Sequence, residues 1–243
     1  MRLHRIHLNP RCREARRDLA DAYQMHATLC RAFFPPETPC PAGSLLWRLE
    51  PETDAEGRPR VLIQSRATPD WSRIPVSAWL ARAEPGIDLV QKLALDTIKP
   101  GQVFRFRLRA NPCKMVQGKR QGLVHPDAQR EWLVRKGEQH GFALPESDTP
   151  DYFDAMQRPD GLAYRDVRVS HEQMLRGTQH GGHAIRVYSV LFEGRLAVTD
   201  AVQFRKVLAT GIGHGKVMGL GLLSIVPATD QPWTTANLGK TAL

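Results

Sequence analysis

Residues 102–110, QVFRFRLRA, form the clearest predicted strand of the chain, because apolar and basic residues alternate along it. The two phenylalanines and Leu108 share one face, which predicts packing against a core. The other face carries Arg105, Arg107 and Arg109. Like charges in a row repel each other unless an anion lies over them. We therefore expect this face to bind a phosphate backbone.

A strand–helix–strand–strand order is predicted ahead of this segment. Residues 3–8 alternate like a half-buried strand, and residues 13–34 favour a helix that ends before two prolines. Further strands are predicted at residues 45–50 and 60–65, with a polar turn between them. This order opens a ferredoxin-like or RNA-recognition fold.

The second half of the chain repeats this order. Its predicted elements are helices at 127–140 and 201–209, paired strands at 185–192 and 194–199, and a final strand at 220–226. The apolar positions of the second helix are Val202, Phe204, Val207 and Leu208. The sequence therefore predicts an α+β protein with two similar halves.

The two halves are expected to join within residues 84–99. We assign residues 1–90 to an N-terminal domain that carries the candidate catalytic helix. Residues 91–227 form a C-terminal domain with the glycine-rich loop and the basic surface. Residues 228–243 are polar and aperiodic, which predicts a flexible tail.

Composition indicates a polyanionic partner. The 243-residue chain has a formal net charge of +9 and a pI of about 9.8, which favours nucleic acid first and an acidic membrane second. No apolar run is long enough to span a bilayer, and the charged start predicts no signal peptide. The cysteines are Cys12, Cys30, Cys40 and Cys113. They form no CxxC pair, so we expect free thiols in a reducing cytoplasm and no metal site.

A glycine-rich stretch follows the last predicted helix. Residues 211–225, GIGHGKVMGLGLLSI, hold five glycines within eleven residues, together with Lys216. Turned backbone N–H groups and a lysine predict a phosphate site at Gly211, Gly213, Gly215 and Lys216. The spacing matches neither a nucleotide P-loop nor a dinucleotide fingerprint. A second interpretation stays open, in which the glycines only ease crowding between helix and strand.

Tyr23 and His26 are candidate catalytic residues. They lie three residues apart, so a helix stacks them on one face, while Met25, Leu29 and Phe33 form a different stripe toward the core. Histidine transfers protons near neutral pH, and a tyrosine hydroxyl donates to an oxyanion. The alternative is an ordinary surface histidine beside a half-buried tyrosine.

Two further segments are predicted to contact RNA. Residues 105–136 carry nine positive side chains, Lys114 among them, against two negative ones. Residues 152–170 carry Arg158, Arg165 and Arg168. The second segment either grips a nucleic acid or is an ordinary surface loop.

Three segments carry a resemblance to a known family. They are residues 16–26 (RRDLADAYQMH), 104–114 (FRFRLRANPCK) and 211–224 (GIGHGKVMGLGLLS). The three segments lie in the order expected for this family. Over about residues 1–227, the chain resembles the CasE endoribonucleases of type I-E CRISPR systems.

The resemblance implies two ferredoxin-like domains in tandem and metal-independent cleavage at the 3′ base of a CRISPR repeat stem-loop, with no cofactor. The products would carry a 5′-hydroxyl and a 2′,3′-cyclic phosphate. The family's catalytic histidine and tyrosine correspond to His26 and Tyr23. The protein would keep the mature crRNA and join the other subunits of Cascade in the cytoplasm, without a membrane.

Other classes of function remain open. One alternative is a non-catalytic RNA-binding module, although the aromatic residues that usually stack bases on such sheets are not evident. Another is a structural subunit of a ribonucleoprotein, in which Tyr23 and His26 are incidental.

Overall fold

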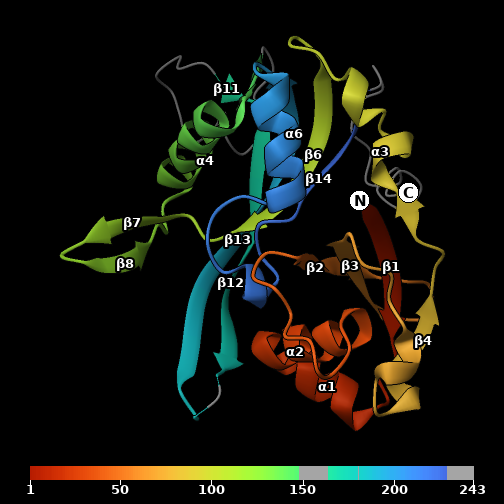
Figure 1. Ribbon diagram of the computed structural model, residues 1–243. Coiled ribbons are helices and arrows are strands. Elements are labelled where there is room, and N and C mark those ends of the chain that lie inside the picture. Colours follow the sequence, from red (N-terminus) through yellow and green to blue (C-terminus); the bar gives the residue numbers. More distant parts are fainter. Residues whose placement is uncertain (148–163, 180, 229–243) are drawn as a thin grey trace.

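The N-terminal sheet is built around β1. The computed structural model describes residues 1–147, 164–179 and 181–228 (Figure 1). The strands are β1 (Arg2–Leu8), β2 (Leu45–Thr53), β3 (Pro59–Ser65), β4 (Leu80–Ala83) and β5 (Ile87–Asp88). All pair antiparallel in the order β2-β3-β1-β4, and β5 also pairs with β1. Helices α1 (Arg13–Ala20) and α2 (Ala22–Phe33) connect β1 to β2 and pack on one face.

The C-terminal sheet has the order β12-β13-β6-β14, again antiparallel. Its strands are β6 (Val103–Ala110), β12 (Val167–Thr178), β13 (Ala184–Val198) and β14 (Leu223–Pro227), with β9 (Phe142–Ala143) paired to β13. Helices α4 (Pro126–His140) and α6 (Ala201–Thr210) cover one face.

Short elements complete the described chain. They are α3 (Leu89–Lys92), the hairpin β7 (Cys113–Val116) and β8 (Lys119–Gly122), the pair β10 (Glu146–Ser147) and β11 (Tyr164–Arg165), and the 3₁₀ turns η1 (Trp71–Arg73), η2 (Ser77–Trp79), η3 (Leu95–Thr97) and η4 (Lys216–Met218). Figure 1 shows the β7–β8 hairpin projecting beside α4.

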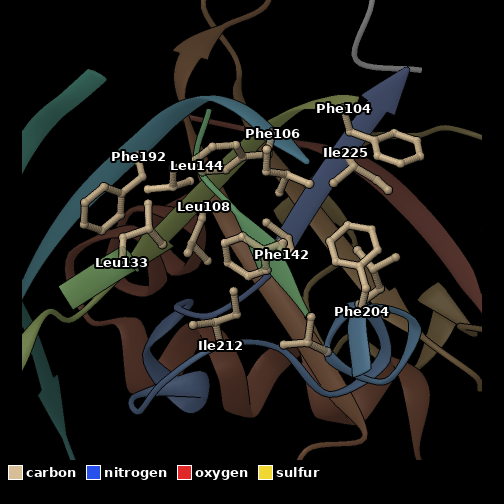
Figure 2. Packing of buried hydrophobic residues seen from close by; sticks show 14 of the residues in the cluster. Phe104, Phe106, Leu108, Leu133, Phe142, Leu144, Phe192, Phe204, Ile212 and Ile225 are labelled. Carbon is tan, nitrogen blue, oxygen red and sulfur yellow. The ribbon is translucent and has the colours of Figure 1, made fainter. Parts of the chain in front are cut away.

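Each sheet has its own core. The N-terminal core joins Met25, Leu29 and Phe33 of α2 to β1, β2 and β3. In the C-terminal core, the apolar face of β6 meets Phe142 and Phe204 (Figure 2). Burial of these side chains is the main stabilising contribution.

The helix-free face of the N-terminal sheet packs against the C-terminal half. Leu46, Leu62 and Leu222 form a small buried cluster between them. Arg48 is 1% exposed, and its Nη1 donates to the carbonyls of Arg107 at 3.0 Å and Leu222 at 3.1 Å. The basic face of β6 therefore lies inside the molecule.

Most predicted elements are confirmed, but three predictions were wrong. The helix predicted at residues 13–34 is two helices, because Asp21 adopts an extended conformation and caps α2. The pair predicted at 185–192 and 194–199 is one strand, β13, which pairs with β12 and β6. Val202 is 65% exposed, while the other three apolar positions of α6 are buried. Residues 229–243 of the predicted tail lie outside the described residues.

Candidate functional site

Asp21 positions the first turn of α2. Its Oδ1 accepts the N–H groups of Tyr23 and Gln24, each at 3.0 Å, which satisfies two donors that a helix N-terminus leaves unpaired. Its Oδ2 accepts the N–H of Thr178, the last residue of β12, at 3.0 Å. One carboxylate therefore begins the helix and ties it to the C-terminal sheet.

Asp18 holds α1 and α2 together. Its buried Oδ2 accepts the Thr28 hydroxyl at 2.7 Å and the Trp79 indole N–H at 2.9 Å. Arg17 donates to its Oδ1 at 2.7 Å. A buried carboxylate with this many donors resists displacement, so α2 has a fixed position for its side chains.

Tyr23 and His26 lie at the edge of the N-terminal core, as predicted. Both are half-buried, whereas Met25, Leu29 and Phe33 face the core. His26 Nδ1 is buried and has no hydrogen-bond partner among the described residues, and Nε2 lies 3.5 Å from Cys30 Sγ. Burial lowers the pKa of His26, because a desolvated imidazole resists protonation. The neutral ring is therefore favoured at neutral pH.

The glycine stretch after α6 folds back on itself. Its five glycines all have positive φ, which a residue with a Cβ rarely adopts. The Gly211 N–H donates to the Val207 carbonyl at 2.7 Å. The Gly221 carbonyl accepts the Ile212 N–H, and the Gly221 N–H donates to the Arg109 carbonyl. The predicted role of Gly211 as a phosphate donor is wrong, because its N–H is used at the end of α6 and the residue is buried.

Residues 213–216 of this stretch fit the phosphate interpretation better than Gly211 does. Gly213, Gly215 and Lys216 are partly exposed, and His214 is exposed. The N–H groups of Gly213 and Gly215 donate to no backbone carbonyl within the described ranges. These two N–H groups and a lysine at an accessible turn make a suitable anion-binding concavity.

Helix α2, the end of β12 and η4 meet beside Tyr23. η4, which begins at Lys216, packs against α2. At Gly177, a Cβ would lie 3.0 Å from Tyr23 Cβ and 3.0 Å from the Met218 thioether. The structure therefore brings the helix that carries Tyr23 and His26 next to the turn that carries Lys216.

A basic pocket lies between α4, the β7–β8 hairpin and the glycine stretch. It has a volume of about 180 Å³ and is lined by Lys114, Arg120, Trp132, Lys136, Gly213, His214 and neighbouring hairpin residues. Burial and then the charges of Arg120, Lys136 and Lys216 lower the pKa of His214. This accumulation of positive charge is suited to a phosphate backbone.

Arg107 and Arg109 do not line an open surface. Arg107 pairs with Glu50, with Glu52 at 3.0 Å and with Glu193 at 2.8 Å. The prediction that this face needs an outside anion was wrong here, because the chain supplies its own carboxylates. Arg109 is buried, and burial followed by the charge of Arg48 lowers its pKa to about 10.

The other predicted arginines differ in their positions. Arg105 is half-buried on β6. Arg165 and Arg168 are exposed, and Arg168 is nine residues from Gly177 along β12, or about 30 Å. Arg158 lies outside the described residues.

Comparison with known proteins identifies the family of the chain. Residues 1–227 match the family described as CRISPR associated protein. The chain belongs to this family.

Relatives of this CRISPR-associated protein support the assignment. It is 39% identical to the CRISPR-associated endoribonuclease Cse3 of Thermus thermophilus, over 93% of this chain and all of the relative. It is 31% identical to the CRISPR system Cascade subunit CasE of Escherichia coli, over 85% and 92% of the two chains. A solved structure of Thermus thermophilus Cse3 with an RNA representing a pre-cleavage complex matches with a TM-score of 0.73 and 35% identity, over 93% of this chain and 98% of that one. Across the described part of this family member, every helix is too short or too polar to cross a membrane.

Sequence reasoning missed four positions of this site in the CRISPR-associated protein. Asp21, with Gln24 three residues later, has the pattern of a helix start and was detectable. Gly177 gave no local signal. Cys30 and Cys40 join His26 in a cluster that only the fold reveals, and hydrogen bonds from the Cys30 thiol and then Ser44 lower the pKa of Cys40 to about 7.

Proposed function

We propose that this protein is an endoribonuclease that binds the stem-loop of CRISPR repeat RNA and cleaves at its 3′ base. The mature crRNA then stays bound within Cascade. Named relatives support this proposal, since one is an endoribonuclease and another a Cascade subunit. The observation that carries it for this chain is the meeting of α2, with Tyr23 and His26, and the basic turn at Lys216.

The proposed reaction is an attack by the 2′-hydroxyl on the neighbouring phosphorus. The 2′-oxygen–phosphorus bond forms, the bond to the 5′-oxygen breaks, and the products carry a 2′,3′-cyclic phosphate and a 5′-hydroxyl. His26 acts as the general base, because its lowered pKa keeps the imidazole ready to accept the 2′-hydroxyl proton. The leaving 5′-oxygen takes a proton from solvent.

Charge on the phosphate is stabilised by this chain's own donors. The Tyr23 hydroxyl, Lys216 and the N–H groups of Gly213 and Gly215 hold the non-bridging oxygens. These donors supply the positive charge that the reaction needs, so we expect cleavage to proceed in EDTA.

The basic pocket continues this site as the track for the RNA backbone. Lys114, Arg120 and Lys136 line or flank it, and Lys216 lies within electrostatic reach. Phosphate contacts of this kind position an RNA without reading its sequence.

The finer fold assignment is part of the proposal. We infer two ferredoxin-like domains in tandem, at residues 1–90 and 91–227. In the N-terminal sheet, β1 lies between β3 and β4, and β2 is at the edge. In the C-terminal sheet, β6 lies between β13 and β14, and β12 is at the edge. This shared order supports the assignment.

The proposal is tested by incubating the protein with an end-labelled CRISPR repeat stem-loop RNA in EDTA. We expect one cut at the 3′ base. Phosphatase should remove the 3′-terminal phosphate of the 5′ fragment only after acid has opened the cyclic phosphate. Binding without cleavage would favour the alternative, a non-catalytic structural subunit of a ribonucleoprotein. Cleavage that requires added Mg²⁺ would contradict the proposed chemistry.

A further inference from the structure

Two cysteines lie beside His26 at the end of the candidate catalytic helix. Cys30 is one turn beyond His26 on α2, and Cys40 belongs to the loop between α2 and β2. Nitrogen and sulfur atoms of the three side chains all lie within 4.8 Å of one another. All three residues are half-buried, so the cluster is neither sealed in the core nor loose on the surface.

The fold holds this cluster together from two directions. An i, i+4 spacing on α2 keeps His26 and Cys30 on the same face. The loop that carries Cys40 contains four prolines within residues 35–41, which restrict its backbone. Its turns close through hydrogen bonds from Thr38 N–H to Pro35 O at 2.9 Å and from Ser44 N–H to Pro41 O at 3.1 Å. The ligand atoms therefore face each other without a large rearrangement.

We propose that His26, Cys30 and Cys40 form a Zn²⁺ site. Zinc takes nitrogen and thiolate ligands tetrahedrally, and bond lengths of about 2.0 and 2.3 Å place two such ligand atoms about 3.6 Å apart. The observed separation between His26 Nε2 and Cys30 Sγ is 3.5 Å. Three protein ligands leave the fourth position for water. On binding, Zn²⁺ replaces the thiol protons, which pass to solvent.

Zinc bound here would inhibit the enzyme rather than assist it. This consequence rests on the proposed function, because it requires His26 to accept the 2′-hydroxyl proton. An imidazole nitrogen whose lone pair is bound to Zn²⁺ cannot accept a proton. The basic pocket is separate from the three ligands, so RNA stays bound while cleavage stops.

Metal binding is measured first, without RNA and without relying on activity. Reduced full-length protein is titrated with Co²⁺, whose tetrahedral thiolate complexes absorb in the near-ultraviolet and visible. We expect one equivalent of Co²⁺ to bind and Zn²⁺ to displace it. The matched variants are Cys40→Ser and Cys12→Ser, because Cys12 lies outside the cluster and serine preserves its hydrogen bond to Glu14. The spectrum should be lost in Cys40→Ser and kept in Cys12→Ser.

Cleavage is measured next, as the ratio of single-turnover rates with and without Zn²⁺ for each protein. We expect the Zn²⁺ concentration for half-inhibition to rise at least about tenfold in Cys40→Ser and to stay unchanged in Cys12→Ser. RNA affinity should not change with Zn²⁺. No thiolate spectrum, or equal inhibition of both variants, would overturn the site. A zinc-free wild-type protein that does not cleave would instead contradict the proposed function, while the Co²⁺ spectrum would still decide the metal site.

Discussion

Burial sets the chemistry of His26. The side chain sits at the edge of a hydrophobic core with Nδ1 unpaired among the described residues, so protonation would place an uncompensated charge there. A histidine on an open helix face would titrate near its ordinary value. The same partial burial favours the neutral imidazole at neutral pH, the form that the proposed general base requires.

The pH dependence of cleavage follows from this shift. The pKa of His26 is lowered from 6.5, so its base form persists below pH 6.5. Under single-turnover conditions, we expect the rate to stay level from neutral pH down and to fall only as pH drops through that lowered pKa. The check is a rate profile with RNA saturation verified at each pH. A rate that rises on acidification would identify His26 as an acid instead.

The sequence predicts the positions of some side chains but not their partners. Helical spacing was enough to separate the Tyr23–His26 stripe from the core stripe, because that pattern depends only on the neighbouring residues. The pattern of β6 placed the arginines on the correct face of the strand. It could not show that Glu50, Glu52 and Glu193 cover Arg107, because those carboxylates come from other strands.

At the scale of elements, the contact of α2, β12 and η4 depends on Gly177. A Cβ there already reaches Tyr23 and Met218, so a valine would force these elements apart. We expect Gly177→Val to reduce the cleavage rate at least about tenfold, since small misplacements of catalytic groups are costly. Gly177→Ala should have a smaller effect. Both rates are compared with thermal unfolding of the same samples, and an unchanged rate in a well-folded Gly177→Val protein would refute the contact's role.

We expect the glycine stretch to have a structural part and a binding part. A Cβ at Gly211 would lie 2.7 Å from Gly221 O, so Gly211→Ala should lower the melting temperature. At Gly213 the nearest side-chain atom to a Cβ is Trp132 at 3.4 Å, and asparagine tolerates its positive φ. Gly213→Asn should therefore keep the melting temperature and weaken RNA binding or cleavage. Normal cleavage by Gly213→Asn would mean that the whole stretch is architectural.

At the scale of the whole molecule, we expect the basic residues to have two different roles, one in stability and one in RNA binding. Arg107 joins the two sheets, and its removal leaves Glu50 and Glu193 buried without that partner. Arg107→Leu should destabilise the protein by about 3 kcal/mol, with an unchanged salt dependence of RNA binding. Lys136→Ala should lower the log–log salt slope by roughly one and leave stability nearly unchanged. Denaturant unfolding measures the stability of both variants, and RNA binding at several salt concentrations measures their salt slopes. A lower salt slope in Arg107→Leu, with an unchanged slope in Lys136→Ala, would contradict RNA binding at the basic pocket.

The overall architecture was predictable because it depends on local periodicity. Repeated strand–helix–strand–strand patterns indicated two similar halves, and β6, α4 and α6 lie where expected. Packing between the halves was not predictable, since Arg48, Leu46 and Leu222 meet only after both sheets form. The cluster of His26, Cys30 and Cys40 was missed for the same reason, because Cys40 lies in a loop that brings it back to α2.

We propose that RNA binding, at the basic pocket, and cleavage, at His26, are separable in this protein. The most direct test measures the single-turnover cleavage rate and the dissociation constant of the same stem-loop RNA for wild type and His26→Ala. We expect the rate to fall by roughly 100- to 10,000-fold, while the dissociation constant stays within about twofold. A His26→Ala protein that retains more than about a tenth of the wild-type rate would show that His26 is not the general base.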